Sequence, residues 1–271
     1  MSPVQPAPVR VDPHRAGTAT ASDVQAERLA EQLRVVKRKL LRRAPGTGPS
    51  NIPRGNLIMI ASALPGEGKS FIARNLALSI STDHDHTVVL VDGDFRKPHI
   101  TGEYGLEGAA GFLDVMSGKV RMPDAIYSTD QRGLAVLPVG TGRHDVNELL
   151  ASRRTAALIE QYFVANSKSI VIFDTSPILC ASEPQVIAKL VGQTLIVVRA
   201  GSTPHSALRQ AISDLGDCAN CAMVLNDADV VPFSSNYPDL YGSYGSTSLP
   251  PQSERPRKSP LSIAGRSKRG E

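Results

Sequence analysis

The segment of residues 63–70, with the sequence ALPGEGKS, constrains the fold more than any other part of this chain. An apolar run, LIMIA at residues 57–61, leads directly into it, and a helical pattern follows at residues 70–81. Small residues let backbone N–H groups converge on a phosphate, and the positive end of the following helix dipole stabilises the anion. The order of strand, glycine-containing loop and helix therefore predicts a phosphate-binding loop of the Walker A type.

Two polar residues at the end of this loop have predicted tasks. The Lys69 ammonium group reaches the outer phosphates, and the Ser70 hydroxyl holds Mg²⁺. Ala63 stands at the first position in place of glycine, a change that the looser form of the motif tolerates. The alternative is a glycine-rich turn without a ligand, which the strand before it and the helix after it disfavour. The predicted nucleotide-binding residues of the loop are Pro65, Gly66, Glu67, Gly68, Lys69, Ser70 and Phe71.

Strand-like and helical patterns alternate from residue 55 onward. Continuous apolar runs indicate strands buried on both faces, and the helical patterns between them indicate crossover connections. We therefore expect an α/β fold of the P-loop NTPase type, with a mainly parallel sheet covered by helices on both faces. The expected strands are residues 57–61, 88–91, 134–138, 170–173, 195–198 and 222–225, and the expected helices include 70–81, 147–163 and 204–215.

Shorter segments flank the α/β domain, which we place at residues 55–229. Leucine and valine recur at spacings of four, three and four between Leu29 and Leu40, which is typical of an amphipathic helix. Such a helix can pack against a partner and serve in oligomerisation. The expected segments are a disordered extension at 1–21, this N-terminal helix at 22–44, a linker at 45–54, a flexible tyrosine-bearing tail at 230–249 and a disordered basic tail at 250–271.

The net charge of +4 is confined to residues 250–271, where six basic residues accompany two acidic ones. The remainder is neutral overall and the chain has no tryptophan, so the composition does not favour nucleic-acid binding. No apolar run approaches the roughly 18 residues that a spanning helix needs. Residues 1–20 also lack the apolar core of a signal peptide. We therefore expect a cytoplasmic protein.

Three aspartates stand at the ends of predicted buried strands. Asp92 and Asp94 follow the run at 88–91, and Asp174 follows the run at 170–173. Because the carboxyl ends of parallel strands meet at one edge of a sheet, these carboxylates are expected to converge beside the phosphate-binding loop. Carboxylate and hydroxyl oxygens suit Mg²⁺, so Ser70, Asp94 and Asp174 are the predicted metal ligands. A simple turn or helix cap explains one such aspartate, but it explains three less readily.

Three segments together resemble the Walker A, A′ and B motifs of bacterial tyrosine kinases, the autokinases of capsular and exopolysaccharide export. They are residues 61–70, residues 90–98 (LVDGDFRKP) and residues 172–179 (IFDTSPIL). The resemblance covers about residues 27–244. The chain is similar in organisation to the stand-alone, exosortase-associated members of the family. It implies an ATP-dependent protein-tyrosine autokinase with ATP and Mg²⁺ as cofactors, which regulates polysaccharide polymerisation and export.

The resemblance also implies roles for particular residues. Lys69, Asp92, Asp94 and Asp174 would be catalytic, with Asp92 as the candidate that orients the proton of an incoming tyrosine hydroxyl. Asn226 and, more weakly, Arg199 would contact the base. The acceptors would be Tyr237, Tyr241 and Tyr244 of a neighbouring subunit. The implied partners are further copies of the chain in a homo-oligomer, a cognate phosphatase and a separate membrane adaptor that recruits the kinase to the inner face of the plasma membrane.

Three positions depart from the family pattern. Ser176 stands where the first of two prolines is usual, and Glu183 stands where an aspartate is common. The segment at residues 31–37 (EQLRVVK) resembles the E-x-x-R-x-x-R oligomerisation signature, with Lys37 in the last place. Lysine lacks the planar fork of arginine, so the departure at Lys37 bears on subunit assembly.

Related partitioning and septum-positioning ATPases share the general fold and place a signature lysine five residues before the Walker lysine. That position is Leu64 in this chain, which favours the kinase over those relatives. The alternative function is a non-kinase regulatory ATPase that organises a membrane complex. A scaffold without turnover would require defective carboxylates, and none of the expected three is missing.

Overall fold

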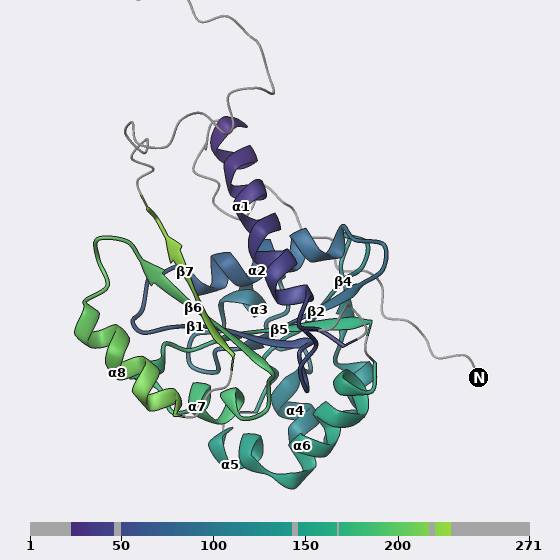
Figure 1. The fold of residues 1–271 in the computed structure, drawn as a ribbon. Helices are drawn as coiled ribbons and strands as arrows, with labels where there is room; N and C mark the ends of the chain where they lie inside the picture. The colour runs from purple at the N-terminus through teal and green to yellow at the C-terminus, as the bar shows by residue number, and fades with distance from the viewer. Residues whose placement is uncertain (1–22, 46–49, 143–145, 167, 217–219, 229–271) are drawn as a thin grey trace, which may run out of the picture. The chain divides into compact units, whose positions relative to one another are not determined.

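The computed structural model describes residues 23–45, 50–142, 146–166, 168–216 and 220–228. Within these residues, seven strands form one sheet in the order β3-β4-β2-β5-β1-β6-β7 (Figure 1). Its neighbouring strands run parallel, apart from the antiparallel pair β3 and β4. The strands are β1 (Leu57–Ser62), β2 (Thr87–Gly93), β3 (Tyr127–Ser128), β4 (Leu134–Leu137), β5 (Ser169–Thr175), β6 (Gln193–Arg199) and β7 (Cys221–Asn226). The mainly parallel α/β fold expected from the sequence is confirmed.

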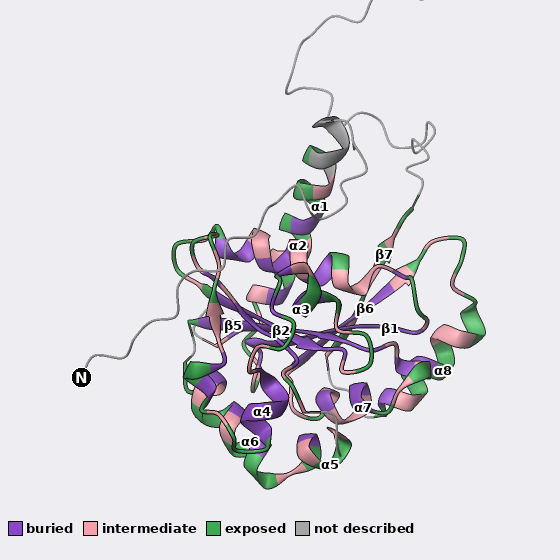
Figure 2. Ribbon diagram, turned by 180° about the vertical axis from the view of Figure 1, so that it is seen from behind, coloured by how far each residue is buried: buried purple, intermediate pink, exposed green. Residues whose placement is uncertain are grey.

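Helices cover both faces of this sheet, and the strands between them are largely buried (Figure 2). Side chains of β1 alternate between two hydrophobic clusters: Ile58 and Ile60 pack with α1 to α3, whereas Leu57 and Met59 pack with α4 to α8. Burial on both faces explains why β1, β2, β5 and β6 read as continuous apolar runs. The expectation is wrong for β7, an edge strand whose Met223 and Leu225 are each 61% exposed. The helices are α1 (Asp23–Leu41), α2 (Lys69–Ser81), α3 (His99–Glu103), α4 (Phe112–Met116), α5 (Val146–Ala151), α6 (Arg153–Ile159), α7 (Glu183–Ala188) and α8 (His205–Leu215), with short turns η1 (Met122–Asp124), η2 (Glu160–Val164) and η3 (Ile178–Cys180).

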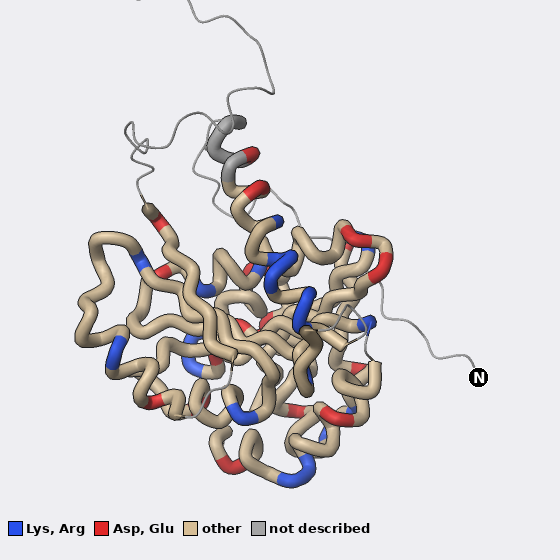
Figure 3. Tube along the Cα trace, viewed as in Figure 1, with Lys and Arg blue, Asp and Glu red and all other residues tan. Residues whose placement is uncertain are grey.

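The N-terminal helix α1 packs against α2 through buried leucines and one lysine. Leu33 and Leu40 are buried, whereas Arg34, Arg38 and Lys39 are exposed. Figure 3 marks the positions of basic residues along α1. Lys37 points inward instead: its Nζ lies 2.9 Å from Asp83 Oδ1 and 2.9 Å from the carbonyl oxygen of Ser79. The family-like position 37 is therefore engaged within this chain, at the C-terminal end of α2.

The single helix expected at residues 147–163 is divided in the structure. It ends as α5, begins again as α6 and continues as the π-helical turn η2. Ser152 is the cause, because it lies between α5 and α6 and its Oγ accepts a hydrogen bond from the backbone N–H of Thr155 at 3.1 Å. Serine is a favoured N-cap residue, so the local sequence starts a new helix there.

Three of the expected segments, at residues 1–21, 230–249 and 250–271, lie outside the described residues. The predicted acceptors Tyr237, Tyr241 and Tyr244 are therefore outside them as well. In the part of the chain that the structure describes, we find no helix with the length and apolar character needed to cross a membrane.

Candidate nucleotide-binding site

The loop between β1 and α2 takes its conformation from two glycines. Gly66 and Gly68 have φ angles of 79° and 91°, a left-handed region that side-chain-bearing residues rarely adopt. A Cβ atom at position 68 would also collide with the amide nitrogen of Asn226. Gly68 directly precedes α2, so the backbone N–H groups of the first turn are left open at the place where the sequence predicts phosphate binding.

Hydrogen bonds of Glu67 stabilise the conformation of this loop. Its side chain is buried, and its Oε2 accepts a hydrogen bond from the backbone N–H of Leu64 at 2.7 Å. Its Oε1 accepts a hydrogen bond from the Thr203 hydroxyl in the loop between β6 and α8. The Asn226 amide donates to the carbonyl oxygen of Glu67 at 3.0 Å. Residues from β6–α8 and β7 thus hold the phosphate-binding loop in place.

Lys69 and Asp94 form an ion pair next to the loop. Lys69 Nζ lies 3.2 Å from Asp94 Oδ2, and the two side chains are 14% and 6% exposed. The other carboxylate oxygen, Oδ1, accepts hydrogen bonds from the Ser176 hydroxyl at 2.7 Å and from the backbone N–H of Lys97 at 3.0 Å. The structure therefore brings together two predicted site residues and adds Ser176 to them.

Asp174 is fully buried at the end of β5, where its Cα is the register partner of Asp92 on β2. Within the described residues, neither of its carboxylate oxygens has a hydrogen-bond partner. Burial raises the pKa of Asp174 to about 7, although the charge of Lys69 and the nearby Ser70 hydroxyl lower it. An unpaired buried carboxylate is costly, so this group is ready to be stabilised by a cation.

Asp92 is also buried, but both of its oxygens are engaged. Oδ2 accepts hydrogen bonds from the backbone N–H and the hydroxyl of Thr101, both at 2.7 Å, and Oδ1 accepts one from the Asp94 backbone N–H at 3.2 Å. Burial raises the pKa of Asp92 to about 6, against the lowering effect of these hydrogen bonds. In this structure Asp92 holds the start of α3, so a contact with an incoming hydroxyl requires one of these bonds to be exchanged.

A cavity of about 500 Å³ lies beside the loop. Its lining combines predicted loop residues with basic side chains that follow β2 and with the segment that follows β5. The lining residues are Pro65, Gly66, Gly68, Lys69, Ser70, Phe71, Asp94, Arg96, Lys97, His99, Ser176, Pro177 and Cys180. A cavity with a phosphate-binding loop on one side and cationic groups on another suits a polyanionic ligand.

The residues present fit Mg²⁺ bound together with phosphate. Across the described ranges, no three His, Cys, Asp or Glu side chains are grouped closely enough to hold a metal ion by themselves. Mg²⁺ commonly takes only one or two carboxylates and completes its shell with phosphate oxygens and waters. The unpartnered carboxylate of Asp174, together with Asp94 and the hydroxyl of Ser70, provides such an incomplete set of oxygen ligands.

Arg199 and Asn226 end the neighbouring strands β6 and β7 and are register partners. Asn226 reaches the phosphate-binding loop through Glu67, as described above. Arg199 instead forms an exposed ion pair with Asp227, with Nη2 and Oδ2 2.7 Å apart. It lines a separate cavity of about 290 Å³ between β7 and the start of α8. The structure thus places the Asn226 side chain in contact with the loop, whereas Arg199, at the end of the intervening strand β6, pairs with Asp227.

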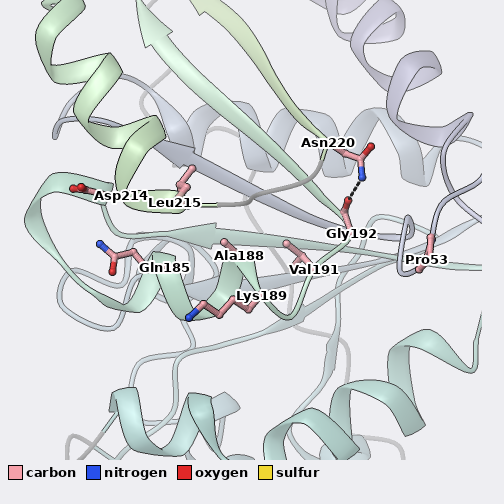
Figure 4. A pocket seen from close by; sticks show the side chains of 10 residues that line it. Pro53, Gln185, Ala188, Lys189, Val191, Gly192, Asp214, Leu215 and Asn220 are labelled. Carbon is pink, nitrogen blue, oxygen red and sulfur yellow. Dashed lines mark hydrogen bonds between the residues drawn. The ribbon is translucent and has the colours of Figure 1, made fainter.

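Another cavity, of about 550 Å³, lies at the opposite edge of the sheet (Figure 4). Gly192 and Asn220 line it, directly before β6 and β7, and the Asn220 amide donates to the Gly192 carbonyl oxygen at 3.4 Å. Lys189 also lines it, with an exposed side chain at the end of α7. This cavity is at the amino ends of the strands and is therefore separate from the nucleotide site.

Sequence reasoning missed three hydroxyl groups that organise the site: those of Thr101, Ser176 and Thr203. Thr101 holds Asp92, Ser176 holds Asp94 and Thr203 holds Glu67. Ser176 was visible as a departure from the family pattern, but its contact with Asp94 joins segments 82 residues apart. No local pattern marks such a pairing.

Individual curated proteins resemble the chain, although no protein-family model matches it. The tyrosine-protein kinase YwqD of Bacillus subtilis is 31% identical over 190 residues, covering 69% of this chain and 77% of YwqD. The putative tyrosine-protein kinase EpsB of Ralstonia solanacearum is 29% identical over 209 residues, covering 73% of this chain. This chain matches only 27% of the length of EpsB.

Solved structures share the fold. The chimerical protein CapA2B2 has a TM-score of 0.65 and 25% identity, over 83% of this chain and 95% of that one. The kinase domain of Escherichia coli tyrosine kinase ETK has a TM-score of 0.63 and 24% identity, over 77% of this chain and 80% of that one, which shows a shared fold. The resemblance expected from the motifs is thereby confirmed: the chain belongs to the bacterial tyrosine-protein kinase family.

Proposed function

We propose that this chain is an ATP-dependent protein-tyrosine autokinase, which transfers the γ-phosphoryl group of ATP to Tyr237, Tyr241 and Tyr244 of a neighbouring subunit. One observation carries the proposal: at the end of β5, beside the Lys69–Asp94 pair, the buried Asp174 carboxylate has no partner among the described residues. Phosphoryl transfer depends on positioning and charge stabilisation, and these groups supply both at one edge of the sheet.

The chain's own residues divide the work of binding and orientation. The open N–H groups at the start of α2 hold the phosphates, and Lys69 exchanges Asp94 for the outer phosphates when the nucleotide binds. Ser70, Asp94 and Asp174 would hold Mg²⁺, which when bound neutralises charge on the phosphate oxygens. Asp92 exchanges a hydrogen bond to orient the hydroxyl of the acceptor tyrosine.

Base recognition is assigned to Asn226, with Arg199 as the weaker candidate. Asn226 is joined to the loop by its 3.0 Å hydrogen bond to Glu67, so a base held there lies within reach of phosphates on the same loop. Arg199 must first release Asp227.

The wider setting is proposed from the relatives. One of them is the succinoglycan biosynthesis transport protein ExoP of Rhizobium meliloti, 34% identical over 179 residues that cover 64% of this chain and 22% of ExoP. We assign this chain a role in regulating exopolysaccharide or capsule polymerisation and export. The proposed partners are further copies in a homo-oligomer, a phosphatase and a membrane adaptor that recruits the kinase to the inner face of the plasma membrane.

The proposed organisation of the chain has the helix at 22–44 as an assembly element, the kinase domain at 55–229 and the tyrosine-bearing tail at 230–249. The reach of that tail supports transfer between subunits. Tyr237 lies eleven positions after Asn226, and at ~3.3 Å per position an extended chain spans ~36 Å between them.

The test is to incubate the purified chain with ATP and Mg²⁺ and to map phosphotyrosine by mass spectrometry. Phosphate is expected on the three tail tyrosines of the wild type. Lys69→Met should abolish it, because the group that balances the phosphate charge is removed. Lys189→Met is the matched control: it removes an exposed lysine at the opposite edge of the sheet and should leave phosphotyrosine unchanged.

Two results would contradict the proposal. Phosphotyrosine retained in Lys69→Met would show that the loop does not supply the transferred group. ATP hydrolysis by the wild type without any phosphotyrosine would instead favour the regulatory ATPase. Thermal unfolding of each variant checks that a loss of activity is not a loss of fold.

A further inference from the structure

Ser176 is buried beside the nucleotide site on a firmly anchored segment. It follows β5, is 1% exposed and lines the 500 Å³ cavity. The preceding residue, Thr175, donates its hydroxyl to the carbonyl oxygen of Ile60 at 3.0 Å and so ties the end of β5 to β1. The backbone that carries Ser176 is thereby fixed to the strand that leads into the phosphate-binding loop.

The hydroxyl of Ser176 shares the Asp94 carboxylate with two other groups. Asp94 Oδ1 accepts from Ser176 at 2.7 Å and from the Lys97 backbone at 3.0 Å, whereas Oδ2 lies 3.2 Å from Lys69. Hydrogen bonds to an ionised acceptor are shorter and stronger than those between neutral groups. The two oxygens therefore have separate functions: one is held by fixed donors, and the other faces a cation.

The partner of Oδ2 has to change when a nucleotide binds. If Lys69 moves to the phosphates, as the proposed function requires, Asp94 loses the ammonium group that neutralises it. The side chain would then be held by the Lys97 N–H alone, were it not for Ser176. A proline at position 176, which the family resemblance leads one to expect, has no side-chain donor and could not make this bond.

We propose that Ser176 is a positioning residue for Asp94. Its hydroxyl holds Oδ1 in place while Lys69 leaves Oδ2, so that Oδ2 stays directed at the site where a divalent cation accompanies the nucleotide. This inference rests on the proposed function, because it takes Asp94 to be a metal ligand. It extends that function by assigning a role to a residue of this chain that the motif pattern does not include.

The test measures nucleotide affinity, not phosphoryl transfer. Binding of a fluorescent ADP analogue to the full chain is titrated with excess Mg²⁺ and again with EDTA. Ser176→Ala is expected to weaken binding about tenfold with Mg²⁺, the loss of one hydrogen bond to a charged group, and less than about twofold with EDTA. Ser176→Thr keeps the hydroxyl and should recover most of the affinity.

The matched control is Ser182→Ala, which removes an exposed hydroxyl from the same segment between β5 and α7. Among the described residues, that hydroxyl accepts a hydrogen bond from Asn147 and makes none with Asp94. Its affinity should match the wild type under both conditions. Thermal unfolding of the variants separates a local effect on Asp94 from a general loss of structure.

The inference is overturned if Ser176→Ala binds as the wild type does with Mg²⁺, or if its loss is equally large with EDTA. It is also overturned if wild-type affinity does not depend on Mg²⁺. Failure of the proposed function looks different: Mg²⁺-dependent nucleotide binding would persist and respond to Ser176→Ala, but no phosphotyrosine would form.

Discussion

Asp174→Asn is expected to stabilise the nucleotide-free chain while removing a group that the site needs. The native carboxylate is fully buried, and neither of its oxygens has a hydrogen-bond partner among the described residues. Burial raises its pKa from 3.8 to about 7. A pKa difference of about 3 corresponds to a folding penalty of ~4 kcal/mol, at ~1.4 kcal/mol for each pKa unit. Asparagine has the same shape without the charge, so it avoids this penalty.

The sign of the pH dependence follows from the direction of the pKa change. Between pH ~4 and pH ~7 the folded chain keeps the proton on Asp174 and the unfolded chain does not, so the free energy of unfolding falls as the pH rises through this window. Above pH ~7 the full cost of burying the ionised Asp174 carboxylate is present. Asp92, with its pKa raised to about 6 by burial, contributes in the same direction, and the substitution at position 174 leaves that part in place.

Urea unfolding with EDTA and without nucleotide measures the effect. At about pH 8 the variant should exceed the wild type by ~4 kcal/mol, and at about pH 5 by ~2 kcal/mol, because protonation has already removed part of the wild-type penalty. The reasoning would be refuted if the variant and the wild type had equal free energies of unfolding at pH ~8. It would also be refuted if their difference were the same at pH ~8 and pH ~5.

Asp114→Asn is the control with the opposite expected sign. Burial alone would raise the pKa of Asp114, but hydrogen bonds from the Thr141 backbone and hydroxyl and from the Gly111 backbone outweigh it and leave the pKa lowered. Loss of this ionised acceptor should destabilise the chain at neutral pH. A stabilised Asp114→Asn would mean that any buried aspartate behaves as Asp174 does.

Two further substitutions, each with a control, test the phosphate-binding loop and the attachment of α1. Gly68→Ala should abolish binding of the fluorescent nucleotide, because Gly68 has a φ of 91° and an added Cβ would collide with Asn226. Gly201→Ala is the control: its φ is 63°, but the space around it is open, so binding should be retained. Equal loss of binding in both variants would contradict this prediction. Lys37→Met should lower the free energy of unfolding by about 1 to 2 kcal/mol through the lost contacts with Asp83 and the α2 backbone. Arg34→Met, at an exposed ion pair, should change it by less than about 0.5 kcal/mol in the same urea titration.

The parts of the site that were predictable are those carried by strand ends. The apolar run before Ala63 and the run before Asp174 each indicate a buried parallel strand, and parallel strands bring their carboxyl ends to one edge. The meeting of Asp92 and Asp174 at one edge agrees with that rule, although their pairing in the register of β2 and β5 was not predicted. Local composition was sufficient for these features because continuous burial leaves a continuous apolar signal.

The parts that could not be predicted depend on contacts between distant segments. Ser176 reaches Asp94, and Thr203 reaches Glu67 across 136 residues. Thr101 donates a hydrogen bond to Asp92. It lies in α3, a five-residue helix that is too short to give a periodic signal in the sequence. A serine or threonine is equally suited to a turn, a cap or the surface, so its residue type alone does not indicate which acceptor it will find.

Helix α2 connects the phosphate-binding loop to helix α1. Its first residue is Lys69, and its last turn includes Ser79, whose carbonyl oxygen receives the ammonium group of Lys37 from α1. Thirteen residues of α-helix make a stiff rod of ~20 Å, so a tilt imposed at one end is shared by the other. Lys69, the proposed phosphate-binding lysine, and the attachment point of α1 therefore lie at the two ends of the same helix.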